Sequence, residues 1–305
     1  FENNTGDEKL DHWRKALSEL IMADISQSKY LSVLSGDQLF NILKKENLLE
    51  AKSFSSEDLK KVAEQGRVEN IIRGSYSKAG NTIRINAMLQ NGRSGEMLAT
   101  EKVEALGEEG MFGAVDELTR RIKTNFKLTA QEIASDIDKD VSNITTSSAE
   151  AYKYYVQGRQ YHAMGQYEQS VPLMEKAISI DPGFAMAYRS LATSYYNRGF
   201  TTKYRFYMQK AMELSNRISD RERYLIQGDF YSATEKTYDK AIEAYSKVLE
   251  LYPDDLFGNW ELGVTYRDLE EWDKAIERFE ACIKLKVPSY LPYDNLADIY
   301  CSQGK

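Results

Sequence analysis

The sequence is poor in the residues that most often build metal and redox sites. Among 305 residues it contains two cysteines, Cys282 and Cys301, and two histidines, His12 and His162. Two cysteines cannot make a disulfide framework or a four-cysteine zinc site, and no Gly-rich phosphate loop is present. The sequence therefore predicts no metal site, no bound cofactor and no catalytic residues in this segment.

Excess positive charge and long apolar runs are also missing. Lysine and arginine number 40 against 47 aspartates and glutamates, which gives a net charge of -7. An acidic chain does not build the basic field that nucleic-acid binding needs, and no apolar run approaches the ~18 residues of a membrane span. We therefore expect no nucleic-acid partner and no membrane span in this segment. Hydrophobic residues at 42% still indicate a globular protein.

Proline and glycine are distributed unevenly, which indicates two architectures in one chain. All five prolines lie in the second half, while most of the glycines lie in the first. Pro182, Pro253 and Pro288 recur at multiples of about 35 residues, a period typical of helix-turn-helix repeats. Because proline cannot continue a helix, each of these prolines is expected to end the second helix of a unit.

The same residue types recur inside each unit. A small residue is followed three positions later by tyrosine, in the pairs Gly158 and Tyr161, Ala192 and Tyr195, Gly228 and Tyr231, and Gly263 and Tyr266. A small residue lets two helices cross closely, and the aromatic ring fills the space beside it. These residues resemble the tetratricopeptide repeat (TPR). The resemblance covers 149–305, as four repeats and the first helix of a fifth.

Stacked TPR units bury a continuous core and wind into a superhelix with a concave face, which the first helix of each pair is expected to line. Aromatic residues and arginine supply much of the energy of protein interfaces. Family members that hold a peptide's terminal carboxylate place lysine and asparagine at these first-helix positions, so the present residues imply a different ligand. Ordinary packing between repeats is the alternative for each aromatic. The predicted partner-binding groove comprises Tyr155, Arg159, Arg189, Tyr196, Trp260 and Arg267.

The first half has the patterns of a mixed α/β domain. Apolar spacing and capping residues predict an order α-β-α-α-β-β-β-α. The complete fold class is therefore an α+β domain, with a mixed sheet and helices, followed by an all-α TPR superhelix. The expected elements are helices at 8–28, from Ser35 or Asp37 to Lys45, at 56–65 and at 111–126, and strands at 30–34, 68–76, 82–90 and 97–104.

The first half also resembles the TolB amino-terminal-like domain of bacterial proteins that carry TPR units. The opening Phe-Glu-Asn-Asn-Thr-Gly-Asp and the segments 70–76 and 80–85 carry this resemblance, over 1–126. In that family a hydrophobic strand precedes the opening segment, and it is missing here. An uncovered sheet edge would favour a homodimer through this domain. The polar stretch 127–148 is expected to be a linker.

Three hypotheses follow. The first is a non-catalytic protein- or peptide-binding scaffold that uses the concave TPR face. The second, implied by the TolB-like resemblance, is a ligand-sensing or dimerising regulatory segment of a bacterial serine/threonine kinase or cyclase, in the cytoplasmic or extracytoplasmic part of a membrane-anchored protein. The third is an enzyme with a site around Asp7, Asp11, His12 and Asp24. The chain starts at Phe1 without methionine and ends partway through a repeat, so we expect a piece of a longer protein.

Overall fold

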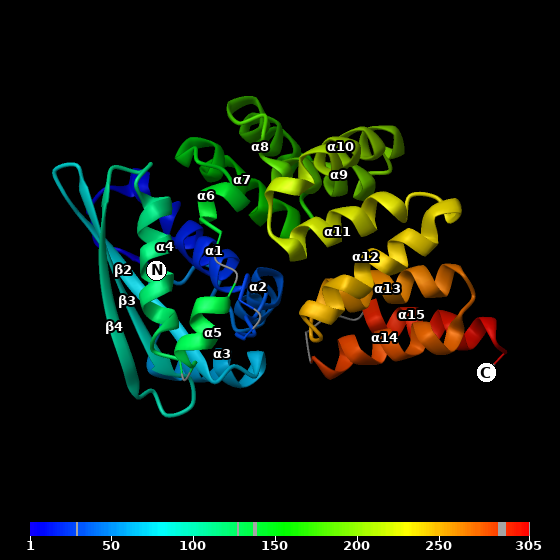
Figure 1. Cartoon of the computed structure of the whole chain (residues 1–305), viewed down its shortest axis with the longest axis horizontal. Coiled ribbons are helices and arrows are strands. Elements are labelled where there is room, and N and C mark those ends of the chain that lie inside the picture. Colours follow the sequence, from blue (N-terminus) through cyan, green and yellow to red (C-terminus); the bar gives the residue numbers. More distant parts are fainter. Residues whose placement is uncertain (29, 127, 137–138, 286–290, 305) are drawn as a thin grey trace.

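The computed structural model describes residues 1–28, 30–126, 128–136, 139–285 and 291–304. A mixed β-sheet with helices forms the first part, and an arc of helix pairs forms the second (Figure 1). This is the expected fold class. Pro288, one of the three prolines that mark the repeat spacing, lies outside the described residues.

The sheet has four strands in the order β1-β2-β3-β4. The first strand pairs with β2 in parallel, with Glu2 opposite Ser75, whereas the other neighbours are antiparallel hairpin partners. The strands are β1 (Glu2–Asn3), β2 (Asn70–Ala79), β3 (Thr82–Asn91) and β4 (Met97–Leu106).

Two helices of the first part, α1 (Trp13–Ile25) and α4 (Met111–Lys123), contribute to the core together with β3. Alternate residues of β3, including Ile83 and Ile85, are fully buried in this core. This period of two is the pattern that predicted the strand. The remaining helices of this part are α2 (Gly36–Lys45) and α3 (Ser56–Gly66), after the short 3₁₀ helix η1 (Glu8–Leu10).

Both α2 and α3 begin with a capping box. The Ser35 hydroxyl accepts the Gln38 backbone N–H at 3.3 Å, and Ser55 does the same for Asp58 at 3.2 Å. In each pair the third helical residue bonds back to the serine N–H, so two otherwise unpaired donors are satisfied. Of the two caps considered for α2, Ser35 is the one that the structure uses.

The expected strand at 30–34 is wrong, because this segment pairs with no strand in the described part of the chain. Its apolar residues Leu31 and Val33 instead pack against the core from a loop between α1 and α2. A short apolar run indicates that a segment is buried but not that its backbone is hydrogen-bonded to a neighbouring strand. It therefore cannot distinguish a strand from a packed loop. The opening residues of β1 were missed as a strand because two residues are too few to show a period.

The stretch after α4 contains two short helices, α5 (Ala130–Ser135) and α6 (Val141–Ile144). Glu132 accepts the backbone N–H of Thr129 at 2.7 Å, as the capping pattern indicated. Val141 and Ile144 are buried in the same core as the sheet. This stretch is therefore packed onto the first part.

The second part consists of antiparallel helix pairs that stack in sequence (Figure 1). The pairs are α7 (Ala149–Ala163) with α8 (Tyr167–Ile180), α9 (Ala185–Asn197) with α10 (Thr201–Leu214), α11 (Asp220–Tyr231) with α12 (Tyr238–Leu251), and α13 (Leu256–Asp268) with α14 (Trp272–Lys284), followed by α15 (Leu291–Ser302). Two 3₁₀ turns, η2 (Ser215–Arg217) and η3 (Glu235–Thr237), flank α11.

The small residue of each repeat lies where two helices cross. A Cβ added at Gly228 would lie 2.2 Å from the ring of Tyr245, which is far inside van der Waals contact. We expect Gly228→Ala to destabilise the protein by about 1–3 kcal/mol through overpacking. Gly113→Ala is the matched control, since a Cβ there meets nothing within 4 Å and alanine favours a helix. Urea midpoints of both variants test this, and equal midpoints would contradict the packing.

One core joins the two parts. An aromatic series runs across the junction: Trp13 of α1 lies 6.3 Å from Phe112 of α4, and Phe112 lies 5.9 Å from Tyr152 of α7. Tyr152 in turn stacks on Phe184, which precedes α9. Since these four rings are almost fully buried, the first repeats are fixed to the α/β part by packing.

The arc also returns to the α/β part at its far end. At the near end, the Ala149 N–H at the start of α7 donates to Glu109 Oε2 at 3.0 Å. At the far end, Arg67 Nη1, at the end of α3, donates to the carbonyl of Lys284, the last residue of α14, at 2.7 Å. The inner face of the arc therefore faces the α/β part.

Candidate binding cavity on the concave face

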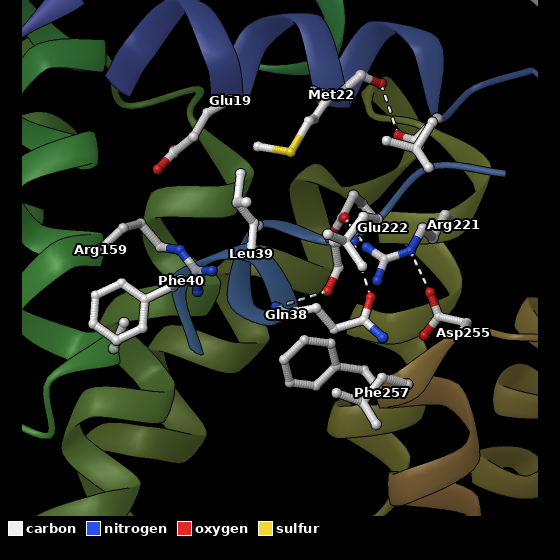
Figure 2. Close-up of a pocket in the computed structure, with 18 of the residues that line it drawn as sticks. Glu19, Met22, Gln38, Leu39, Phe40, Arg159, Arg221, Glu222, Asp255 and Phe257 are labelled. Carbon is white, nitrogen blue, oxygen red and sulfur yellow. Dashed lines mark hydrogen bonds and ion pairs between the residues drawn. The ribbon is translucent and has the colours of Figure 1, made fainter. Parts of the chain in front are cut away.

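A cavity of about 1370 Å³ lies between the inner face of the arc and the α/β part. One wall comes from α1, α2 and their loops, and the other from α7, α9, α11 and α13 (Figure 2). The volume exceeds the roughly 300–1,000 Å³ of ordinary small-molecule pockets. A helical peptide about 10 Å wide, rising 1.5 Å per residue, occupies about 120 Å³ per residue, so the volume matches about a dozen residues.

All six residues of the predicted groove line this one cavity. Their environments differ, however. Tyr155 is 8% exposed and packs 4.7 Å from the ring of Phe184, so it belongs largely to the core. Tyr196 is 62% exposed and leans on Tyr204 at 5.2 Å. The structure thus brings the six together, while their role in binding stays a prediction.

The other four residues of the predicted groove differ in their exposure to the cavity and in their bonds to neighbouring side chains. Arg159 is half-buried beside α2 (Figure 2). Trp260 is half-buried with its edge against Phe279 at 5.6 Å. Arg267 bonds to Asn295 and, at 2.7 Å, to Asp268. Trp260 therefore packs against the second helix of its own repeat and also lines the cavity.

Arg189 belongs to a series of ion pairs across the middle of the concave wall. Its Nε donates to Asp229 Oδ2 at 2.9 Å, and its Nη1 lies 3.9 Å from Glu222 Oε2. Burial opposes the charge of Arg189, but the neighbouring Asp229 and Glu222 raise its pKa above the usual value. The pairs connect α9 to α11, so they fix the relative position of two repeats.

Arg221 continues this series toward α13. Its Nε donates to Asp255 Oδ2 at 2.6 Å, and its Nη1 bonds to Glu222. Asp255 also caps α13, because its Oδ1 accepts the Gly258 N–H at 2.7 Å. The sequence reading missed Arg221 and Asp255, although an aspartate shortly after Pro253 is the usual sign of a helix cap.

Glu261 is an acidic residue of this wall whose carboxyl has no partner among the described residues. It lies on α13, is half-buried, and its carboxyl has no hydrogen bond or ion pair to any part of the chain that the structure describes. Burial, and then the negative charge of Asp229, raise the pKa of this carboxyl to about 8. The acid is therefore mostly protonated at neutral pH. No sequence pattern could reveal this, since it depends on which helices meet.

The raised pKa makes stability depend on pH. Between its ordinary pKa near 4.5 and about 8, the folded state holds a proton at Glu261 that the unfolded state releases, so stability falls as pH rises through this window. Glu261→Gln removes this loss and is expected to stabilise the protein by about 2 kcal/mol at pH 8.5, allowing for partial solvent contact. At pH 4.5 the two proteins should unfold alike. A pH-independent difference in urea midpoint would contradict the assignment.

The opposite wall is apolar. Met22 of α1 and Leu39 and Phe40 of α2 are half-buried and line the cavity (Figure 2). Leu43 of α2 is also half-buried and lines the cavity. The capping box predicted α2 correctly, but nothing in its sequence indicated that it faces the repeats. The sequence patterns therefore predicted a groove formed by the repeats alone and did not predict the second wall formed by α1 and α2.

The residues considered for an enzyme site are not gathered in a cleft. Asp7 caps η1, and Asp24 is buried and bonds to Thr119. His12 lies 3.1 Å from Glu108, and Asp11 accepts a bond from Asn3. None of the four lines the cavity. Within the described ranges, no three His, Cys, Asp or Glu side chains lie close enough to hold a metal ion.

Comparison with protein families supports the repeat assignment. Models described as "Tetratricopeptide repeat" match residues 154–184, 222–255 and 261–288, which confirms TPR repeats in these three segments. Among the described residues, no helix has both the length and the apolarity that crossing a bilayer requires.

Individual relatives resemble parts of the chain. "Putative adenylate cyclase 3" of Rhizobium meliloti (strain 1021) is 29% identical over 198 residues, which are 63% of this chain and 31% of that protein. The chain therefore spans about a third of that relative's length. The solved structure of TTC0263, a thermophilic TPR protein of Thermus thermophilus, is 20% identical. The match covers 50% of this chain and 83% of the TTC0263 chain, with a TM-score of 0.43. The crystal structure of MamA is 22% identical, and the match covers 48% of this chain and 84% of MamA, with a TM-score of 0.34.

Proposed function

We propose that this chain is a non-catalytic protein-interaction scaffold whose concave face binds a peptide or protein segment. The observation that carries the proposal is the single cavity that all six predicted groove residues line. Its volume suits a peptide of about a dozen residues, and a peptide there would contact exposed Tyr196 and half-buried Trp260. Aromatic anchors of this kind supply much of the energy of protein interfaces.

The test must avoid residues whose removal leaves a buried charge without its partner. Arg189 is unsuitable, because its removal leaves the buried carboxylate of Asp229 without its cation. Tyr196→Ala combined with Trp260→Ala is the better variant, and Phe206→Ala is its control, since Phe206 is 57% exposed and does not line the cavity.

Random peptides displayed on phage are selected on the full chain, and their affinities are measured by fluorescence anisotropy. We expect the double variant to bind the selected peptides at least about tenfold more weakly, and the control to bind them as the unmodified chain does. Peptides that bind the double variant unchanged, or that lose affinity only with the control, would reject the groove as the binding site.

A second candidate function is that of a regulatory segment in a bacterial serine/threonine kinase or cyclase. The observation that favours it is the similarity to "Putative adenylate cyclase 3", which is about three times as long as the matched part. The complete reading frame tests the idea. A kinase or cyclase domain whose activity changes on adding a selected peptide would support it, and a reading frame without such a domain would end it.

Homodimerisation belongs to this second candidate. The opening residues cover only part of β2, and at the other edge of the sheet β4 exposes Met97, Leu98 and Leu106. We propose that a second copy pairs at this edge, and that residues 1–126, 127–148 and 149–305 form the dimerising domain, the connecting segment and the TPR array. Analytical ultracentrifugation should then show a dimer that a proline at a β4 edge position disrupts, and a monomer at all concentrations would contradict it.

A further inference from the structure

The two walls of the cavity differ in chemistry, and this difference restricts what can lie between them. The α/β wall presents the half-buried apolar side chains of Met22, Leu39 and Phe40. The repeat wall presents the ion-pair series, of which Figure 2 shows Arg221, Glu222 and Asp255, and aromatic side chains that include Phe257. A ligand that is apolar all round would leave the charged wall desolvated, and one that is polar all round would leave the apolar wall in contact with water. An amphipathic ligand satisfies both.

Glu261 marks the polar contact point on the repeat wall. On α13 it lies one turn from Phe257 and just under one turn from Val264, and all three line the cavity. Residues at this spacing share a helix face. The carboxyl of Glu261 is therefore presented from the same face as two apolar side chains.

The groups around Glu261 are already engaged with one another. Asp229 of α11 accepts a bond from Arg189 of α9 through one carboxylate oxygen and from Tyr245 of α12 through the other. The Tyr204 hydroxyl of α10 donates to the Asp229 carbonyl. The local cation is thus committed to Asp229, and Glu261 is left without a counterion among the described residues.

Asp268 completes the charged surroundings. It lies on α13 with Glu261, adds a further negative charge near that carboxyl, and bonds to Arg267. The titratable neighbours of Glu261 in the described part of the chain are accordingly acids, tyrosines and an already paired arginine. A cation brought by a ligand would supply the counterion that these neighbours do not provide.

We propose that the cavity binds an amphipathic helix of about three turns, which packs its apolar side on Met22, Leu39 and Phe40 and presents a lysine or arginine to Glu261. This inference rests on the proposed peptide-binding function and specifies its ligand. Binding of the cation ionises the Glu261 carboxyl, whose proton passes to solvent. Because that acid has a pKa of about 8 in the free protein, binding at neutral pH releases a proton.

An acidic segment is the competing ligand. Arg205 lines the same cavity, is exposed, and has no ion pair within the described part of the chain. It lies on α10, the second helix of its pair, where water already solvates its charge. The half-buried Glu261 gains more from a counterion than an exposed arginine does, so the structure favours the basic segment.

The test uses three synthetic helical peptides of about twelve residues, with leucine and phenylalanine along one side and lysine, glutamine or glutamate at one position on the other. Isothermal titration calorimetry on the full chain, in two buffers of different ionisation enthalpy, gives affinity and proton release together. We expect the lysine peptide to bind about tenfold more tightly than the glutamine peptide and to release close to one proton at pH 7. Its advantage should grow as the pH rises toward about 9.

Two variants locate the effect. Glu261→Gln should abolish both the lysine preference and the proton release while it retains binding of the glutamine peptide. Asp254→Asn removes an exposed acid of the same cavity and should change neither. Circular dichroism confirms that both variants are folded.

The outcomes separate this inference from the function on which it rests. Equal affinity for lysine and glutamine peptides, or a preference for glutamate, would overturn the basic-helix inference and leave peptide binding intact. Binding of none of the three would also overturn it, and the phage-selected peptides would then decide the proposed function independently. Proton release that persists in Glu261→Gln would assign the cation to another acid and overturn the role given to Glu261.

Discussion

Asp229→Ala is expected to destabilise the protein by about 3–5 kcal/mol, because it breaks a buried ion pair on one side only. Asp229 is 7% exposed and accepts bonds from Arg189 at 2.9 Å and from the Tyr245 hydroxyl at 3.0 Å. Without the carboxylate, Arg189 keeps only the longer contact with Glu222, and the buried Tyr245 hydroxyl loses its partner. Urea denaturation followed by circular dichroism measures the loss.

Two comparisons make this prediction specific. Asp254→Ala removes an exposed aspartate and should change stability by less than about 0.5 kcal/mol. Replacing Asp229 and Arg189 together by leucine and methionine should recover much of the loss, since no buried charge is then left alone. If Asp229→Ala is no worse than Asp254→Ala, the ion pair does not connect the repeats as described.

Phe112→Ala is the second substitution with a large expected effect, and it should alter the cooperativity of unfolding as well as the stability. Phe112 of α4 is buried between Trp13 of α1 and Tyr152 of α7. Removing a buried phenylalanine ring costs about 3–5 kcal/mol. Because the ring is a direct contact between the sheet part and the first repeat, we expect the variant to unfold in two steps where the unmodified chain unfolds in one.

Separate probes detect the two steps. Fluorescence of Trp13 follows the α/β part in a chain whose other tryptophans are replaced by phenylalanine, and far-ultraviolet circular dichroism is dominated by the repeat helices. The two curves should coincide in the unmodified chain and diverge in Phe112→Ala, whereas Phe206→Ala, an exposed site, should shift neither. Coincident curves in Phe112→Ala would show that this ring does not couple the parts.

The repeat half could be predicted from the sequence because its fold depends on local spacing. A glycine or alanine followed three residues later by tyrosine locates each helix crossing, and the structure has Gly228 packed against Tyr245 at such a crossing. The residues at which α2 and α3 begin could also be predicted from local sequence, because Ser35 and Ser55 cap the helices that follow them. The same reasoning gave the six predicted groove residues, which line one cavity and whose role in binding stays a prediction.

The pairing of the groove residues and the second wall of the cavity depend on which distant elements meet, and no local sequence pattern contains that information. Arg189 and Trp260 were read as equivalent groove residues, yet one is paired with Asp229 on the next repeat and the other is half-open to the cavity. Phe40 on α2 belongs to the opposite wall only because the arc returns to the α/β part. The protonated state of Glu261 likewise arises from burial beside Asp229.

The central claim is that a peptide lies between the two walls, and cross-linking tests it most directly. p-Benzoylphenylalanine is placed in turn at the positions of Phe40, on the α/β wall, of Phe257, on the repeat wall, and of Phe206, outside the cavity. The chain is then illuminated with a phage-selected peptide bound. We predict saturable cross-links from 40 and 257 and none from 206. Cross-links from 206 alone, or from neither wall, would contradict the account.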